Sequence, residues 1–344
     1  MSTTSKWSES SLPAVRAELL SLAEAGPVDT APLFAEAHAA RVSVETLRIT
    51  GRDRVRFLHA MLSNDVMLLD KAGPGHGVRA TLNSVQGRLV ADAHLYLVDP
   101  EKKTGSLLAL FEPGAAGAFV EMLDRYVIAE KVYFEPEELA AIAVVGPGAG
   151  DALARAGLTL DDGDHRHAEG TVGDATVRVL RRDLGAPEGH LLLTSPDDAD
   201  AVEAALGLPS ASASQLEAAR IEAGLPRPGG DVTSINIVLE GGLKDRAVSF
   251  TKGCYIGQEV ICRLDSMGTP ARLLVQLEAD AAPAPGTELF AGPKSVGWVT
   301  SSVVSERKGA AVFLGYVKKR SNDIGASVTV GASDGPAATI TAHV

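Results

Sequence analysis

The strongest chemical signal in the chain is a cysteine between glycines in residues 249–260, SFTKGCYIGQEV. Cys254 follows Lys252 by two residues and precedes the aromatic Tyr255. The apolar spacing of residues 258–264 predicts a helix, so the cysteine would lie just ahead of a helix N-terminus. Because that end of a helix and a nearby ammonium group both stabilise a thiolate, the segment predicts a Cys254 thiol with a lowered pKa.

Other kinds of cysteine chemistry have no support in the sequence. The chain has only two cysteines, which is typical of a reducing compartment. They form no C-x-x-C pair, so neither a zinc site nor a thioredoxin motif is predicted. No histidine is near Cys254 in the sequence, so spacing alone does not indicate a protease-type nucleophile. Free cysteine is commonly a small buried residue, and we expect Cys262 to pack in a core.

A second candidate is the segment from Asn83 to Arg88 together with Asp92. Asp92 lies in a predicted strand whose other residues are mostly apolar, which favours a partly buried carboxylate. A buried carboxylate needs partners, or its pKa rises. The alternative is an aspartate on the solvated face of a strand, and the pattern alone does not decide between the two.

Two further motifs are weaker. Residues 143–151 place a glycine-rich turn between a strand and a helix, as in a phosphate-binding loop. Pro147 removes one amide donor and Asp151 puts negative charge where phosphate would lie, so a plain turn is favoured. His165 and His167 alternate in an acidic segment, but no third ligand has a suitable spacing. We therefore expect a solvated loop there, and no metal site.

Hydrophobic periodicity indicates which elements position these residues. Residues 8–40 predict two helices broken at a Gly-Pro pair, and residues 42–50 alternate like a single strand. A hairpin with its turn near residues 84–87 follows, and a second mixed unit starts near residue 139. From residue 271 onward the pattern is nearly all strand with Gly and Pro turns, which predicts a small antiparallel barrel.

The elements just before the cysteine are a helix and a long loop. Ser214 is predicted as the N-cap of a helix that runs to about Ala223, with Glu217 completing a capping box. Residues 231–256 have weak periodicity, which predicts a structured loop with short helical turns. A loop of this length inside a compact domain usually has a functional role.

Composition limits the classes of protein that fit. The 344 residues are 45% apolar and 22% charged, which excludes a disordered chain, a collagen or a disulfide scaffold. No apolar run is long enough to predict a membrane span. A formal net charge of −12 argues against a direct nucleic-acid partner. The first residues do not match a secretory or organelle signal. We expect a cytoplasmic monomer without a membrane partner.

The residues 252–259, KGCYIGQE, resemble the signature of the folate-binding YgfZ family. These proteins are relatives of the glycine-cleavage T-protein, a tetrahydrofolate-dependent aminomethyltransferase. Residues 47–65, 83–92 and 220–227 resemble other segments of that family in the same order and spacing. The resemblance covers roughly residues 42–320, and the first forty residues lie outside it.

The resemblance implies an α+β fold in which three modules form a ring around a central folate cavity, two mixed folate-binding modules and a C-terminal antiparallel β-barrel. The implied divisions are a helical N-terminal extension over 1–40, a first module over 41–138, a second module with the Lys-Gly-Cys motif over 139–267 and the barrel over 268–344.

The resemblance also implies a binding site for tetrahydrofolate or a one-carbon derivative of it. The buried carboxylate that holds the pterin ring corresponds to Glu222, and a carboxylate suits the adjacent N–H donors of a pterin. The other residues implied to bind the cofactor are Asn83, Asp92, Arg227, Tyr255 and Gln258, and those implied to act in chemistry are Cys254, Lys252 and Asp92. Basic residues cluster between 220 and 263, which suits the anionic tail of folate or, alternatively, a solvated face.

The implied function is support for the assembly or repair of iron–sulfur enzymes, including tRNA-modifying ones, with folate and these client enzymes as partners. The alternative is an aminomethyltransferase or folate-dependent demethylase, because one fold hosts several reactions. The T-protein hairpin motif has two glycines and two aspartates, whereas this chain has Gly87-Arg88 and Ala91-Asp92. Arg88 and Ala91 depart from the transferase pattern, while the Lys-Gly-Cys motif of the YgfZ branch is intact.

Overall fold

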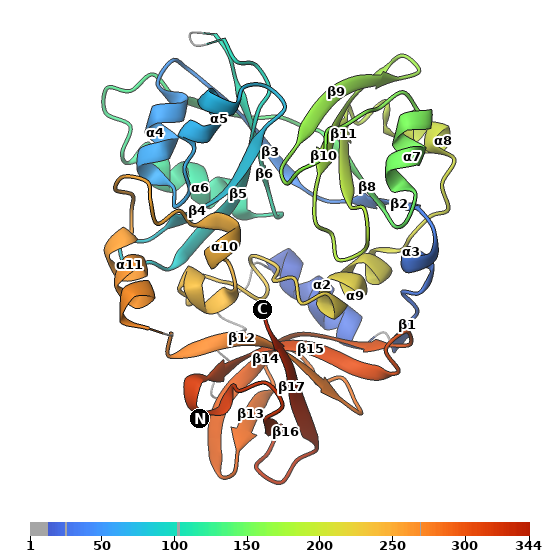
Figure 1. Cartoon of the computed structure of the whole chain (residues 1–344), viewed down its shortest axis with the longest axis vertical. Coiled ribbons are helices and arrows are strands. Elements are labelled where there is room, and N and C mark those ends of the chain that lie inside the picture. Colours follow the sequence, from blue (N-terminus) through green and yellow to red (C-terminus); the bar gives the residue numbers. More distant parts are fainter. Residues whose placement is uncertain (1–12, 25, 102–103, 269) are drawn as a thin grey trace.

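The computed structural model describes residues 13–24, 26–101, 104–268 and 270–344. Three sheets organise these residues. In Figure 1 two mixed units lie side by side above a β-rich C-terminal unit, and α2 and α9 lie between them. We call these parts the first unit, the second unit and the barrel. The arrangement is the predicted α+β fold with a C-terminal antiparallel barrel.

The first unit is an antiparallel sheet in the order β4-β5-β6-β3-β7 with three helices. Its elements are β3 (Glu45–Thr50), α4 (Arg54–Met61), α5 (Met67–Ala72), β4 (Gly77–Asn83), β5 (Leu89–Leu97), β6 (Leu107–Phe111), α6 (Ala115–Asp124) and β7 (Tyr133–Pro136). The predicted hairpin is β4–β5. Strand β5 is buried almost throughout, because one face packs in the core under the helices and the other, through Tyr96, meets the second unit.

The second unit is an antiparallel sheet in the order β2-β8-β11-β10-β9. Its elements are α3 (Pro32–Ala35), β2 (His38–Val42), β8 (Ala140–Val145), α7 (Ala149–Arg155), β9 (His167–Val172), β10 (Ala175–Arg181), β11 (His190–Thr194) and α8 (Ala199–Leu206). An apolar core forms between the sheet and its helices, so this unit, like the first, has its own core.

Two predictions for the N-terminal part are wrong. The second helix of residues 8–40 is replaced by β1 (Pro27–Val28), α3 and β2. The strand predicted over 42–50 is β3 and starts only at Glu45, because Val42 still belongs to β2 in another sheet. The start of the first predicted helix, residues 8–12, lies outside the described residues. Alternation predicts extended backbone but not its partner. The chain joins the second unit through β2 before it builds the first, and the sequence pattern does not mark the break after Val42.

The barrel consists of six antiparallel strands, and β14 pairs with both β13 and β15 to close it. Its strands are β12 (Arg272–Ala279), β13 (Glu288–Ala291), β14 (Lys294–Ser305), β15 (Ala310–Lys318), β16 (Ser327–Val330) and β17 (Ala337–His343), with η2 (Lys319–Ser321) after β15. Strand β1 adds in parallel to β14. The outer wall packs against α2 (Pro13–Glu24) and α9 (Ala213–Glu222), so the barrel is joined to the rest as predicted.

The segment between α9 and the barrel crosses the middle of the molecule (Figure 1). It contains η1 (Val238–Gly241), α10 (Lys244–Ala247) and α11 (Gln258–Met267), which confirms the predicted loop with helical turns and the helix after it. The capping box of α9 is formed by Ser212 and Gln215, not by Ser214 and Glu217. The N-cap lies two residues earlier than predicted, so Glu217 falls beyond the N3 position and instead pairs with Arg220 in the interior. None of the described helices is both long and apolar enough to cross a membrane.

Candidate functional site

Lys252 ties the Lys-Gly-Cys loop to the first unit. Its Nζ donates to the carbonyl oxygens of Leu62 at 2.6 Å and Asn64 at 3.3 Å, and to that of His59. Three carbonyls use all three donors of an ammonium group. The ammonium also lies 5.1 Å from the centre of the Tyr255 ring. Burial lowers the pKa of Lys252 to about 8, so it is mostly charged at neutral pH.

Cys254 is exposed on this loop, while its neighbours are fixed. Tyr255 is buried, and burial raises the pKa of its phenol. Gly257 caps α11 with a φ of 81°, and a Cβ there would lie 2.4 Å from the Ser84 carbonyl oxygen. The motif loop therefore packs directly on the β4–β5 turn, and Gln258 begins α11 at that contact.

The other cysteine departs from its prediction. Cys262 is half-buried on α11 and not enclosed in a core. Burial, with a smaller effect from Asp265, raises the pKa of its thiol. A thiol with a raised pKa has less thiolate and reacts slowly. Slow alkylation of Cys262 therefore stays a prediction, and the raised pKa is its physical reason.

Asp92 is buried, at 4% exposure, and is paired with Arg79 of the neighbouring strand. Arg79 Nε lies 3.1 and 3.0 Å from the two carboxylate oxygens, and Nη2 lies 2.6 Å from Oδ2. The interpretation of Asp92 as a solvated aspartate is thus wrong. The sequence did not point to Arg79. A β-bulge between Leu82 and Asn83 shifts the register so that Thr81 pairs with Asp92 and Arg79 lies diagonally opposite, and counting back from the turn without this bulge would put Arg79 on the other face.

Asn83 offers an unused polar atom at the end of β4. Its side chain is fully buried, and Nδ2 donates to Thr81 Oγ1 at 3.0 Å. Its Oδ1 has no partner among the described residues. A buried carbonyl oxygen without a partner is costly, so it suits a ligand that brings an N–H donor.

Glu222 has its own partners at the end of α9. Oε1 accepts from Thr30 at 2.8 Å and from Ser305 at 2.5 Å, and Oε2 accepts from Arg307 Nε at 2.9 Å. These contacts join α9 to the N-terminal segment and to the barrel. No contact between Glu222 and Asp92 is found in the described part of the chain, so the structure does not bring the two predicted carboxylates together.

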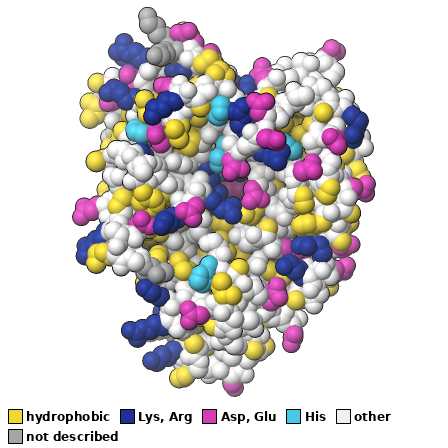
Figure 2. Space-filling model, viewed as in Figure 1, with side chains coloured by type: hydrophobic (Ala, Val, Ile, Leu, Met, Phe, Trp, Pro, Cys, Tyr) yellow, Lys and Arg dark blue, Asp and Glu magenta, His cyan; other side chains and the backbone are white. Residues whose placement is uncertain are grey.

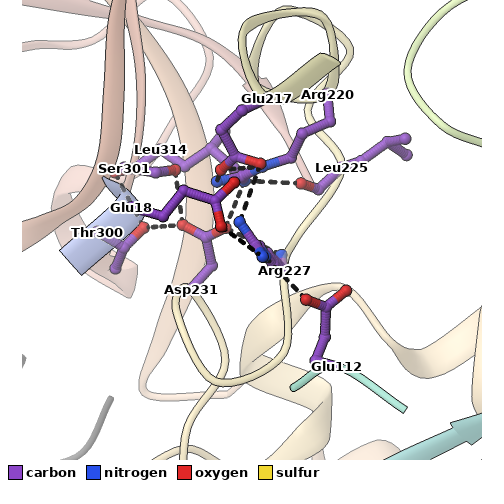
Figure 3. A network of polar contacts seen from close by, with 10 residues as sticks. All are labelled: Glu18, Glu112, Glu217, Arg220, Leu225, Arg227, Asp231, Thr300, Ser301 and Leu314. Carbon is purple, nitrogen blue, oxygen red and sulfur yellow. Dashed lines mark hydrogen bonds and ion pairs between the residues drawn. The ribbon is translucent and has the colours of Figure 1, made fainter. Parts of the chain in front are cut away.

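A buried charge network lies where the three parts meet (Figure 3). Arg227 contacts Glu112 at 2.9 Å, Glu217 at 3.3 Å and Glu18 of α2 at 3.0 Å. Burial alone would lower the pKa of Arg227, but the carboxylates raise it above its ordinary value. Arg227, predicted to bind folate, is thus surrounded by carboxylates of this chain.

The network continues through Arg220 into the barrel. Arg220 contacts Glu217 and Asp231, and Asp231 accepts from Ser301 at 2.8 Å and from Thr300. Arg220 is therefore structural in its contacts and not part of a solvated basic face. The exposed basic residues Lys244 and Arg246 pair with Asp265 and Asp183.

The structure explains the glycine-rich turn of residues 143–151 and the histidine segment. Glu188 accepts from the Gly150 backbone N–H at 3.2 Å, so a carboxylate of the chain occupies the glycine-rich turn where a phosphate would bind. His167 is buried beside Tyr96, with ring centres 5.4 Å apart, so the predicted solvated loop is wrong for it. Within the described ranges, no group of three His, Cys, Asp or Glu residues is arranged to hold a metal ion.

The surface between the first and second units is charged. Figure 2 shows a groove between the two upper units, with Lys, Arg, Asp and Glu side chains along it toward the middle of that face. His94 and His165, with ring centres 5.5 Å apart, pack where the units meet.

Comparison with known proteins gives matches over most of the chain. Residues 272–344 match the glycine cleavage T-protein C-terminal barrel domain. The chain is 30% identical over 300 residues to a putative chloroplastic transferase of Arabidopsis thaliana, covering 83% of this chain and 66% of that protein. It therefore spans just under two thirds of the length of that relative.

Two other relatives are similar over a comparable part. The tRNA-modifying protein YgfZ of Yersinia pestis is 30% identical over 259 residues, which are 70% of this chain and 71% of that protein. The human mitochondrial iron–sulfur cluster assembly factor IBA57 is 29% identical over 267 residues, 73% and 70% of the two chains. The glycine-cleavage aminomethyltransferase T of Bartonella henselae superposes with a TM-score of 0.80 at 20% identity, over 91% and 87% of the chains, which shows a common fold.

Proposed function

Because the chain belongs to the family of YgfZ and the glycine-cleavage T-protein, we propose that it binds tetrahydrofolate and supports the assembly or repair of iron–sulfur enzymes, including tRNA-modifying ones. The relatives named for tRNA modification and for iron–sulfur cluster assembly support the second half of this proposal. The folate half is supported by the fold and by the polar atoms that the site offers.

The observation that carries the proposal is the state of the Lys-Gly-Cys loop. Cys254 is exposed, and Lys252 is anchored by three backbone carbonyls of the first unit. A thiol presented on a loop that is fixed at both sides suits contact with a partner protein or a reactive group. In this proposal the Cys254 thiol makes the contact with the partner or reactive group, while Lys252 positions the loop and contributes positive charge.

The state of Asp92 argues against the alternative, an aminomethyltransferase or demethylase. A carboxylate that assists group transfer must be free to accept or stabilise a proton, and Asp92 is held by Arg79 through two guanidinium nitrogens. With Arg88 and Ala91 in the same hairpin, the transferase motif is incomplete. We propose that Asp92 keeps Arg79 in place beside the cofactor.

A bound reduced folate would supply a carrier for one-carbon groups. Asn83 Oδ1 fits the group, because it is buried and would accept an N–H of the pterin. Since the described residues bring Glu222 into contact with neither Asn83 nor Asp92, we propose its carboxylate as a separate acceptor, at which pterin N–H groups would replace Thr30 and Ser305 at Oε1 while Arg307 keeps Oε2. Tyr255, Gln258 and Arg227 would border the ligand.

The proposal is tested by deleting the gene in its own organism and assaying iron–sulfur enzymes, tRNA-modifying ones among them, with and without added reduced folate. We expect several of these enzymes to lose activity and the full-length chain to restore it. Unchanged iron–sulfur enzymes, together with release of methylamine or ammonia from an aminomethylated lipoyl protein by the purified chain, would establish the transferase instead.

A further inference from the structure

The second unit contains a cavity that has no role in the proposed function. It has a volume of about 430 Å³ and is lined by residues of α7, of the loop after α7, and of β10, β11 and the loop between them. Leu153, Leu158 and Val179 form an apolar part of this lining. A cavity of this size, with a few polar groups on an apolar wall, is typical of a site for a small molecule.

Arg181 of β10 is the cation of the lining. Its Nη1 lies 3.3 Å from Nε2 of His190, which is itself only 2% exposed. Because a guanidinium group only donates, Nε2 of His190 accepts this hydrogen bond and helps to hold the arginine in place. No described carboxylate lies within ion-pair distance of Arg181, so its other N–H groups are available to a ligand that carries a carboxylate.

Glu188, which also lines the cavity, is held by the glycine-rich turn. Its carboxylate accepts from the Gly150 backbone N–H at 3.2 Å, and this hydrogen bond lowers the pKa of Glu188. Glu188 is one of two non-glycine residues in the described ranges with a positive φ, here 51°. Residues in this strained backbone conformation cluster at ligand sites. Glu188 is thus bound to the turn and does not form an ion pair with Arg181.

The charges of the lining favour a zwitterion. Besides Arg181 the lining has two carboxylates, those of Glu188 and Asp162, and Asp162 is exposed with no ion pair to any described residue. An acid without an amine would add a third negative charge beside these two, and an amine without an acid would leave Arg181 unpaired. A molecule with both a carboxylate and an ammonium group can pair with Arg181 and Asp162 at once.

We infer that this cavity binds a free α-amino acid with an apolar side chain. The carboxylate of the amino acid pairs with Arg181, its ammonium group lies toward Asp162, and its side chain packs against Leu158 and Val179. Burial of that side chain adds the apolar part of the binding free energy. The inference goes beyond the proposed function, because none of these residues belongs to the folate site or to the motif loop, and either can fail without the other.

The test is calorimetric titration of the full chain with L-leucine and L-phenylalanine, and with the deaminated and the decarboxylated analogue of each. We expect at least one of the two amino acids to bind. Each of its analogues should bind about tenfold more weakly or not at all, because it leaves one charged group of the cavity without its partner. An analogue that binds as tightly as the amino acid would overturn the assignment of a zwitterion.

Two substitutions place the binding in this cavity. Arg181→Gln should weaken it about tenfold or more. Arg155→Gln removes an exposed arginine at the end of α7, outside the lining, and should leave it unchanged. Asp162→Asn should weaken binding of the amino acid but not of its deaminated analogue.

Methyl NMR of the unsubstituted chain gives a measurement that does not depend on the folding of a variant. The signals of Leu158 and Val179 should shift when the amino acid is added. The inference is overturned if neither amino acid binds, if Arg181→Gln with an unchanged circular dichroism spectrum binds as tightly as the unsubstituted chain, or if both methyl signals stay in place.

Discussion

The Asp92–Arg79 pair is the buried interaction on which our choice between the two proposed functions rests. Both side chains are nearly enclosed, with 2% and 11% of their surfaces exposed. Two charges out of water are stable together because each satisfies the other, and removal of one leaves an uncompensated charge. In our proposal the pair holds both side chains in place at the site.

Replacement of Arg79 should consequently cost stability. We expect Arg79→Leu to lower the free energy of unfolding by about 3–5 kcal/mol, because Asp92 stays buried without a partner. The double variant Arg79→Leu/Asp92→Leu should recover a large part of this loss. Urea denaturation of the two proteins measures the difference. A double variant less stable than the single one would show that the pair does not interact as described.

Folate binding at Glu222 is a separate prediction at the same scale. Glu222→Ala should weaken tetrahydrofolate binding by about 2–5 kcal/mol, as for a desolvated charged pair that loses one member. Ser305→Ala removes only a competitor for Oε1 and should leave binding unchanged or tighter. Calorimetry on the folded variants measures both. Equal weakening by the two substitutions would mean that the contacts of Glu222 are purely structural.

At the scale of elements, the motif loop is shaped by its contact with the β4–β5 turn. Gly257 has a positive φ, and a Cβ there would overlap the Ser84 carbonyl. Gly253, in contrast, has open space around it. The two glycines that bracket Cys254 thus differ, one required by packing and the other free.

This difference gives a matched pair of substitutions. Gly257→Ala should destabilise the protein by about 1–3 kcal/mol through backbone strain and the displaced turn, and should alter the alkylation rate of Cys254. Gly253→Ala should change the free energy of unfolding by no more than about 0.5 kcal/mol. Thermal or urea unfolding compares them. Equal effects of the two substitutions would contradict the packing described here.

Elements with strong local patterns could be predicted from sequence, and their partners could not. The hairpin, the helix after the cysteine and the barrel follow from periodicity and turn residues. The structure of residues 27–42 does not follow from periodicity, because β2 is a strand only through its pairing with β8. The pattern left the burial of Asp92 open, and its partner Arg79 depends on a register shift within the hairpin. Glu112 comes from a segment 115 residues away from its partner Arg227, so no local pattern marks it.

At the scale of the whole molecule, charged and aromatic contacts hold the units together. Arg227 joins α2, the first unit and α9, and Asp231 extends the network to the barrel (Figure 3). We propose domain boundaries near residues 138 and 267. The described residues before 42 do not form a separate extension, because β1 pairs with β14 of the barrel and β2 with β8 of the second unit. Histidines His94, His165 and His167 pack between the two upper units.

These histidines predict how stability depends on pH. Burial lowers the pKa values of His165 and His167 from 6.5 to about 4, so they stay neutral in the folded protein. Between pH 6.5 and 4 the unfolded chain binds more protons, so stability must fall as pH falls through this range. The loss is on the order of 2–3 kcal/mol per histidine at pH 4. Denaturation of His167→Asn across this range should show a shallower slope, and an unchanged slope would contradict the assignment.

The central claim is that the chain works through an exposed thiol on a folate-binding fold, and one measurement tests it most directly. Strains that lack the gene are complemented with Cys254→Ser or Cys262→Ser, and the activity of iron–sulfur enzymes is assayed at matched protein levels. Both changes keep nearly the same volume, and each removes one thiol. We predict that Cys262→Ser restores activity and Cys254→Ser does not. Full complementation by Cys254→Ser would contradict the claim and leave the motif with a structural role.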